Sequence, residues 1–238
     1  MSFVHAKNSR VLVNDAHLSG TINGYTLGHT RQLSDVTTVL DDGHRWVPGL
    51  LGGSMALRGL FDSAAGSVHE TVSAAAGVDD GLLVTVMPDA FTIGRPAFIA
   101  VTDLEGYSVD ASVSEAVTVQ IDAQPDDGVD WGVSLHAHGA ETATGNSASV
   151  DNAESTSGGG VASLHVTAVS GTTPSLTVKV QHSTDNSVWV DLITFTAATA
   201  ASSERKTVTG TVNRYTRETH TISGTTPSFT YAVAFARR

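Results

Sequence analysis

Histidine is the residue type in this sequence best suited to acid–base chemistry or metal binding, and there are ten histidines. Imidazole is a common metal ligand and a proton shuttle near neutral pH. His69 and Glu70 begin like the helix of a zinc protease, but the position of the second histidine holds Ser73. His136 and His138 point to the same side of an expected strand and could share a metal, yet surface pairs of this kind are more often solvated. We therefore expect no metal site.

Sequence motifs of enzymes and cofactor-binding proteins are also missing. There is no Gly-x-Ser-x-Gly elbow, no phosphate-binding Gly-Lys-Ser/Thr loop and no dinucleotide-binding glycine pattern. Asp-Asp-Gly begins at Asp41, Asp79 and Asp126 without the further oxygen ligands of a calcium loop, so we expect three tight turns with glycine at positive φ. A scattered Ser-His-Asp triad has no discriminating value in a chain this rich in the three residues. We expect no catalytic residues, no cofactor and no enzymatic activity.

The composition favours β-structure. The 238 residues are 40% hydrophobic but only 16% charged, and cysteine is absent, which excludes disulfides and thiolate metal sites. Apolar residues alternate with polar ones over short segments separated by turn signals. No apolar run has the length of a signal peptide or of a membrane span, so we expect synthesis in a cytoplasm and no membrane contact. In the first half the expected strands are 10–13, 17–22, 54–61, 82–87, 97–102, 107–113 and 117–123.

One helix is expected, over residues 63–76. Asp62 or Ser63 can cap its N-terminus, and Gly77 can end it. A narrow apolar face recurs at helical spacing and is formed by Ala65, Val68, Val72 and Ala75. We expect this short amphipathic helix to lie against a sheet.

The chain changes character near residue 140. Residues 1–140 hold 17 acidic and 6 basic residues, whereas residues 141–238 hold 7 of each. Residues 139–160 are small and polar, as in a linker or a long surface loop. We place a domain boundary here, giving domains 1–140 and 141–238. The acidic excess of the first domain disfavours stable nucleic-acid binding.

The second half contains an internal repeat. Ser-Gly-Thr-Thr-Pro-Ser begins at Ser170 and again at Ser223, and alternating apolar residues flank both copies. We expect each copy to form strand, turn and strand. Two such hairpins in about 100 residues predict a β-sandwich or jelly roll.

The segment 35–51 carries apolar residues in a turn-rich context, namely Val39, Leu40, Trp46, Val47 and Pro48. Apolar groups in a loop need a partner. Either the loop folds over its own domain or it contacts another subunit, and the sequence favours neither.

Together these segments resemble the major tail (tail tube) proteins of long-tailed bacteriophages. The resemblance rests on the strand 10–13, the hairpin 18–25 and the stretch 46–62 that leads into the helix, in that order, and it covers about the first 140 residues. The second half is similar to the jelly-roll-like domains appended to many actinobacteriophage tail proteins, through Arg214-Tyr215 and the repeated Ser-Gly-Thr-Thr-Pro.

The resemblance implies a mainly β fold, with a tail-tube β-sandwich or barrel domain carrying one short helix, followed by a β-sandwich domain. It also implies a structural virion protein that forms stacked, usually hexameric rings around a channel for DNA. The implied partners are copies of the chain, the tape measure protein and the tail terminator, while DNA passes without stable binding. The implied location is the virion tail, after assembly in the host cytoplasm. The segment 35–48 would be the contact between rings, and the channel-facing acids would be Asp110, Glu115 and Asp122.

A carbohydrate-binding or adhesin protein is the alternative. It would act through the second domain, with Trp189, Tyr215 or Tyr231 stacked on a sugar ring. Trp189 and Tyr231 lie in strand patterns, where aromatic residues more often belong to the core.

Overall fold

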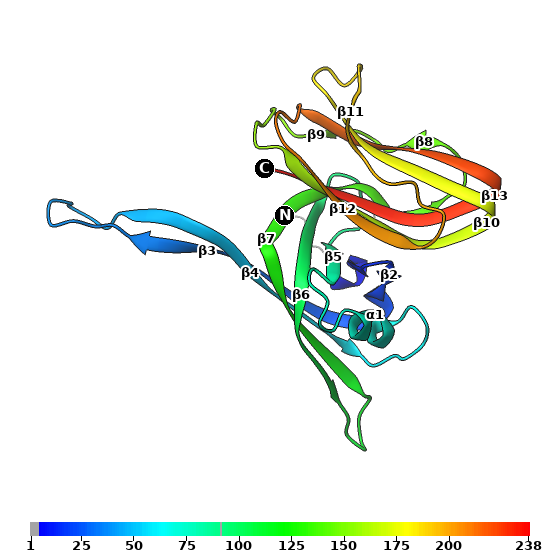
Figure 1. The fold of residues 1–238 in the computed structure, drawn as a ribbon, viewed down its shortest axis with the longest axis horizontal. Coiled ribbons are helices and arrows are strands. Elements are labelled where there is room, and N and C mark those ends of the chain that lie inside the picture. The colour runs from blue at the N-terminus through cyan, green and yellow to red at the C-terminus, as the bar shows by residue number, and fades with distance from the viewer. Residues whose placement is uncertain (1–4, 91) are drawn as a thin grey trace.

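The computed structural model describes residues 5–90 and 92–238 and is built almost wholly of antiparallel strands. Figure 1 shows a body from which two hairpins project. One is a long arm formed by β3 (Ile22–Asp35) and β4 (Trp46–Leu60), and the other is formed by β6 (Pro96–Asp110) and β7 (Thr118–Glu141). One α-helix occurs among the described residues. The predicted mainly β fold with one short helix is confirmed. No helix of the described residues is long and apolar enough to cross a membrane.

The first half forms a continuous sheet. Its strand order is β3–β4–β7–β6–β5–β1–β2, and every pairing is antiparallel. The other bounds in this half are β1 (Arg10–Val13), β2 (Ala16–His17), β5 (Leu82–Met87), β6 (Pro96–Asp110) and β7 (Thr118–Glu141), with 3-10 helices η1 (Ala6–Asn8) and η2 (Leu18–Gly20).

The core of this half lies on one face of the sheet. Met55 and Leu57 of β4 and Ile121 of β7 alternate with exposed or half-buried neighbours, because side chains along a strand point to opposite faces. They pack in one cluster with Val68 and Val72 of the helix α1 (Val68–Ala74).

The helix is shorter than predicted. It begins after Ser67, and residues 63–67 form turns instead, so Ala65 is exposed and does not extend the apolar face. The hydroxyl of Ser67 donates to the carbonyl of Asp62, which closes this preceding turn. Local bonding of this kind competes with helix formation.

The second half is built on a ribbon of two long strands, β10 (Gly160–Ser183) and β13 (Tyr215–Arg237). They pair along their whole length, from Gly160 opposite Arg237 to Ser183 opposite Tyr215. The two repeat copies lie opposite each other, with Thr172 paired to Thr225. The prediction of two separate hairpins is therefore wrong: each copy is an irregular corner within one strand, and the copies pair with each other.

At these corners the ribbon folds back on itself and forms a sandwich. Gly171 and Gly224 adopt φ of +115° and +124°, and a Cβ on Gly171 would lie 2.8 Å from the carbonyl oxygen of Thr226. Val166, before the corner of β10, and Val178, after it, pack in the same buried cluster. Glycine is needed at the corners because side chains rarely tolerate that backbone conformation or that close approach.

Each layer of the sandwich has additional strands at both edges. β7 and β12 (Ser202–Val208) flank the half of the ribbon that holds residues 160–170 and 228–237. β11 (Val190–Thr194), β8 (Gly145–Asn146) and β9 (Val150–Asp151) flank the other half. The small polar stretch 139–160 thus pairs with β13 over part of its length.

The two halves of the chain share a strand and a core. Residues 118–133 of β7 pair with β6, and residues 133–141 pair with β13. A third buried cluster joins Leu12 and Ile99 of the first half to Val161 and Ala234 of the second. The domain boundary at residue 140 stays a prediction.

Candidate assembly surface

The arm exposes most of its apolar side chains. β3 and β4 pair from Ile22 opposite Gly59 out to Asp35 opposite Trp46, and this ribbon leaves the body as an extended projection (Figure 1). Its exposed large apolar side chains are Leu33, Val36, Val39, Leu40, Trp46, Val47, Leu50 and Leu51. Contiguous apolar exposure of this kind marks interaction sites in soluble proteins.

The predicted contact residues all lie on this arm. Val39 and Leu40 are fully exposed at its tip, whereas Trp46 and Val47 are about half exposed on β4 and are followed by the exposed Pro48. The segment therefore does not fold over its own domain, which was one of the two alternatives. Leu50 was not among the predicted residues, although it is 79% exposed on the same strand.

Hydrogen bonds order the tip of the arm. The backbone N–H of Thr37 donates to Asp35 Oδ1 at 2.8 Å, and that of Thr38 donates to Asp41 Oδ2 at 2.8 Å. The hydroxyl and backbone N–H of Thr37 hold the pKa of Asp35 below its ordinary value, and the two groups of Thr38 do the same for Asp41. Both carboxylates stay ionised near neutral pH, so these hydrogen bonds hold the backbone of the tip in one conformation.

The sheet of the first half has two free edges. Within residues 5–90 and 92–238, β3 pairs with β4 alone, and residues 103–110 of β6 pair with β7 alone. These edges bound the four-stranded part β3–β4–β7–β6 on opposite sides. An unpaired edge presents backbone N–H and C=O groups that can pair with another chain.

One face of this four-stranded part is open and mainly polar, with Leu60 as an exposed apolar residue on it. Residues directly opposite each other in a sheet share a face, so Asp122 lies beside Ala56 of β4, and Arg58 lies beside Gln120. The opposite face carries Met55, Leu57 and Ile121 and is covered by α1. The open face is formed by Gly24, Thr26, Gly28, Ser54, Ala56, Arg58, Leu60, Gly106, Ser108, Asp110, Thr118, Gln120 and Asp122.

The structure brings together two of the three predicted channel-facing acids. Asp110 and Asp122 lie on the open face, where Asp110 and Arg58 line the same shallow hollow. Glu115 lies apart from them, in the turn that joins β6 and β7, and is exposed. The sequence did not show which acids share the open face, because the pairing register between strands cannot be read from it.

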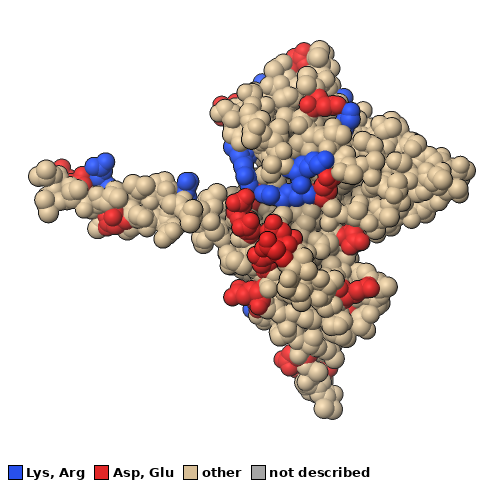
Figure 2. Space-filling view, viewed as in Figure 1, with Lys and Arg blue, Asp and Glu red and all other residues tan. Residues whose placement is uncertain are grey.

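A second group of acids lies elsewhere and was not predicted as a site. The pKa of Asp80 is raised by partial burial and by its neighbours Asp126, Asp79 and Asp103. Figure 2 shows acidic side chains gathered beside basic ones near the base of the arm. Two of the Asp-Asp-Gly motifs supply Asp79, Asp80 and Asp126 and were the only signal for this group in the sequence, whereas Asp103 comes from β6.

The Asp-Asp-Gly motifs do not all form the turns that were predicted. The motif at Asp126 is a bulge inside β7, with both Asp127 and Gly128 at positive φ. In the motif at Asp79 the second aspartate, Asp80, takes positive φ in place of the glycine. Aspartate tolerates positive φ better than most residues, so the prediction that glycine would hold this conformation in the motif at Asp79 was wrong.

The histidines are arranged differently from the prediction. A bulge in β7 opposite β13 separates His136 from His138, so the two no longer share a face. His138 packs against the tilted ring of His17 and forms a hydrogen bond with Thr167. His136 is 7% exposed and stacks on Tyr231. The expectation of solvated histidines is therefore wrong.

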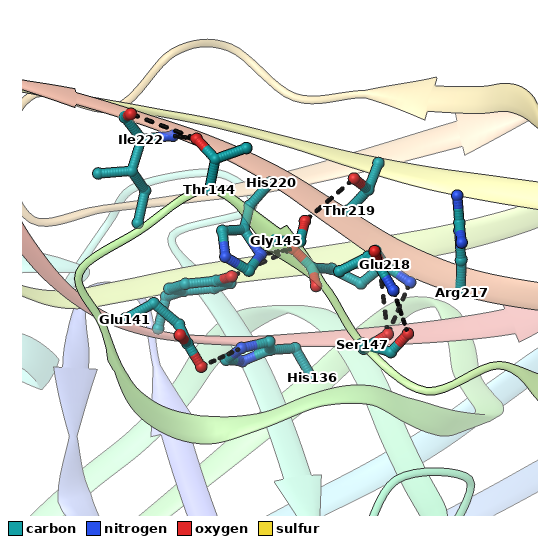
Figure 3. A network of polar contacts seen from close by, with 12 residues as sticks. His136, Glu141, Thr144, Gly145, Ser147, Arg217, Glu218, Thr219, His220 and Ile222 are labelled. Carbon is teal, nitrogen blue, oxygen red and sulfur yellow. Dashed lines mark hydrogen bonds and ion pairs between the residues drawn. The ribbon is translucent and has the colours of Figure 1, made fainter.

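A group with metal-binding atoms occurs elsewhere, between the sandwich layers. It consists of His136, Glu218 and His220, all buried (Figure 3). No spacing in the sequence could have found it, because His136 is far from the other two along the chain.

The three aromatic residues considered for sugar stacking all contact other side chains of the chain. The Arg217 guanidinium lies 4.2 Å from the centre of the Trp189 ring, and that of Arg214 lies 4.9 Å from the Tyr215 ring. Tyr231 is fully buried, as expected for a core residue, and its hydroxyl donates to Glu218 Oε1 at 3.1 Å.

Comparisons with known proteins give distant similarity. No protein-family model and no curated protein sequence matches the chain. Among solved structures, a chain from the virion of a native gene transfer agent particle is 12% identical, with a TM-score of 0.42, over 53% of this chain and 97% of that one. The SPP1 tail tube protein is 14% identical, with a TM-score of 0.40, over 54% and 78%. The SPP1 Dit protein is 9% identical, with a TM-score of 0.36, over 96% and 98%. Similarity at this level is too low to establish fold or function.

Proposed function

We propose that the chain is a structural subunit of a bacteriophage tail tube. Copies would join side by side through the free edges of the first sheet, and the resulting rings would stack through the arm. The observation that carries the proposal is the combination of two unpaired sheet edges with an apolar arm that the described residues of its own chain leave uncovered. The sequence resemblance to tail tube proteins points the same way.

The two free edges suit a ring because they belong to different strands, β3 and the distal part of β6. Pairing the β3 edge of one copy with the distal β6 edge of the next is a head-to-tail contact, and such contacts generate closed rings when the rotation between copies closes. Each copy would then satisfy the edge groups of two neighbours. Six copies is the number that the resemblance implies.

In such a ring the open polar face would line the channel. Apart from Leu60, the neutral side chains of this face are small or polar and offer DNA few contacts. Asp110 and Asp122 would repel phosphates within about one Debye length, roughly 8–10 Å. Arg58 on the same face would offset part of that charge. DNA would pass without stable binding, because affinity for phosphates comes mainly from basic residues.

The arm would contact the neighbouring ring through Val39, Leu40, Trp46, Val47 and Pro48. Fully burying a Val or Leu side chain contributes about 1.5–3 kcal/mol, and stacked rings would bury several per copy. The tape measure protein and the tail terminator would be the other partners. The protein would assemble in the host cytoplasm and reside in the virion tail, with residues 141–238 as a second domain outside the tube.

Negative-stain electron microscopy of the purified chain, over a range of protein and salt concentrations, tests the proposal. We expect rings or hollow tubes of uniform width. In the double variant Val39→Ser/Leu40→Ser the concentration needed for tubes should rise more than about tenfold, since 1.4 kcal/mol is a factor of ten. Rings should persist, because the sheet edges are unchanged. Val188→Ser is the matched control, since Val188 is an exposed valine of the second half.

Two outcomes would contradict the proposal. One is a chain that stays monomeric at every concentration and salt, and the other is tube formation that the arm variant leaves unchanged. A monomeric chain that binds glycans on an array would instead support the carbohydrate-binding alternative.

A further inference from the structure

The cluster of His136, Glu218 and His220 lies between the two layers of the sandwich. His136 comes from β7 in one layer, and Glu218 and His220 come from the half of β13 that belongs to the other. One ligand atom from each residue lies within 4.8 Å of the others. Glu218 is 0% exposed and His220 is 4% exposed, so the group is shielded from solvent (Figure 3).

Two polar atoms of this cluster are unsatisfied. Glu218 Oε2 and His136 Nδ1 are buried and have no hydrogen-bond partner among the described residues. Glu218 Oε1, by contrast, accepts from the hydroxyl of Tyr231 at 3.1 Å. Buried polar groups in folded proteins are nearly always paired, so two unpaired atoms in one cluster point to a missing partner.

Both ring nitrogens of His220 face an oxygen atom, and a neutral imidazole cannot donate to both. Its Nε2 lies 3.0 Å from the carbonyl oxygen of Ala143, and its Nδ1 lies 3.0 Å from Glu218 Oε1. A neutral imidazole carries one N–H and can donate to only one of these oxygens. When Nε2–H donates to Ala143, the lone pair of Nδ1 faces a carboxylate oxygen, and only a proton or a metal ion between them removes the repulsion.

His136 is oriented in the same way. Its Nε2 lies 3.4 Å from Glu141 Oε1, and a carboxylate at this distance favours the tautomer that carries the N–H on that nitrogen. Nδ1 is then the unprotonated nitrogen, and it is the buried atom without a partner. A ligand histidine typically donates its other N–H to a carboxylate or a backbone carbonyl, and both arrangements are present here.

We propose that this cluster is a Zn²⁺ site with ligands His136 Nδ1, His220 Nδ1 and a Glu218 carboxylate oxygen. Two imidazoles and one carboxylate form a known zinc ligand set, with water able to supply a fourth ligand. Calcium and magnesium prefer all-oxygen sites. Ligand atoms around tetrahedral zinc lie about 3.3–3.6 Å apart. One ligand atom of each residue already lies within 4.8 Å of the others, so zinc binding needs only a small approach of the three side chains. The ion would tie the two layers of the sandwich together.

The competing arrangement is metal-free. In it His220 is protonated and forms a buried ion pair with Glu218. Burial alone lowers the pKa of His220, but the hydrogen bond and charge of Glu218 outweigh it and raise that pKa overall. This arrangement leaves Glu218 Oε2 and His136 Nδ1 unsatisfied, whereas zinc binding uses His136 Nδ1 and neutralises the Glu218 carboxylate.

The test is a calorimetric titration of the chelator-treated, dialysed full chain with Zn²⁺. We expect one Zn²⁺ per chain. Glu218→Gln and His220→Gln should each weaken binding more than 100-fold, because they remove a ligand, and Glu141→Gln should weaken it about 10–100-fold. His138→Gln is the matched control, because His138 is a neighbouring histidine of the same strand outside the cluster, and it should bind as the wild type does.

A measurement on the wild-type chain tests the proposal even if a variant fails to fold. In ¹⁵N NMR, adding Zn²⁺ to the wild type should shift the Nδ1 resonances of two histidines and leave their Nε2 resonances protonated. Circular dichroism of each metal-free variant shows whether it is folded. The proposal is overturned if the wild type binds no stoichiometric Zn²⁺, if no histidine Nδ1 shifts, or if folded His220→Gln binds as tightly as His138→Gln.

Discussion

The arm and the C-terminal sandwich are both built on a long antiparallel ribbon, but the sandwich buries its apolar side chains and the arm exposes most of its own. The ribbon of β10 and β13 folds back at Gly171 and Gly224 and buries Phe229 against its own other half. The ribbon of β3 and β4 stays extended and exposes Leu40 and Trp46. A two-stranded ribbon alone is marginally stable in water. A folded-back ribbon therefore stabilises its own chain, whereas the extended ribbon leaves its apolar surface exposed.

The largest expected difference between the two ribbons is in the cost of removing an apolar side chain. Phe229→Ala should lower the free energy of unfolding by about 3–5 kcal/mol, because it leaves a cavity in a fully buried site. Leu40→Ala should change it by less than about 0.5 kcal/mol. Urea denaturation followed by circular dichroism, at a concentration too low for assembly, measures both. A comparable loss in the two variants would mean that the arm packs on its own chain.

The second prediction concerns the junction between the two halves and its response to acid. His165 of β10 is fully buried, with Nδ1 2.6 Å from the carbonyl oxygen of Asn14 and Nε2 2.7 Å from Thr85 Oγ1. Burial lowers its pKa to about 4 and outweighs the hydrogen bond with Asn14 and the charge of Asp15, which both act to raise it. The unfolded chain takes up a proton below about pH 6.5, and the folded chain does so only near pH 4. The free energy of unfolding should therefore fall by about 3 kcal/mol between pH 6.5 and pH 4.

Denaturation midpoints at several pH values between 7 and 4 check this slope. His165→Gln removes the titrating group and should flatten the slope. Part of the slope should remain, because burial also lowers the pKa of His138 at the same junction to about 4. An unchanged slope in His165→Gln would show that the junction does not respond to this histidine.

The smallest of the three effects is expected at the corner of the folded-back ribbon. Gly171→Ala places a Cβ 2.8 Å from Thr226 O at a φ of +115°, and such strained positions cost about 1–3 kcal/mol. Gly24→Ala on the extended ribbon is the matched control, because a Cβ there meets nothing within 4 Å. Thermal unfolding of the two variants measures the difference. Equal melting temperatures of the two variants would contradict the claim that the corner of the ribbon requires glycine at position 171.

Local patterns in the sequence located several elements correctly. Strands β1 and β5 have the predicted bounds, because each is a short alternating or apolar run with clear turn signals on both sides. Val68 and Val72 were placed correctly on the buried face of the helix. The predicted strands 97–102 and 107–113 are in fact one strand, β6, because pairing with β7 carries it through an irregular register near Gly106.

The sequence alone determined the β-rich composition, the apolar residues of the arm and the presence of two related segments in the second half. Those features depend on which residues are neighbours along the chain. The tertiary structure decided that the related segments pair with each other, that a bulge separates His136 from His138, and that Asp110 and Asp122 share the open face. It also brought His136 to Glu218 and His220. Each of these depends on register between distant strands, and a shift of one residue exchanges the two faces of a strand.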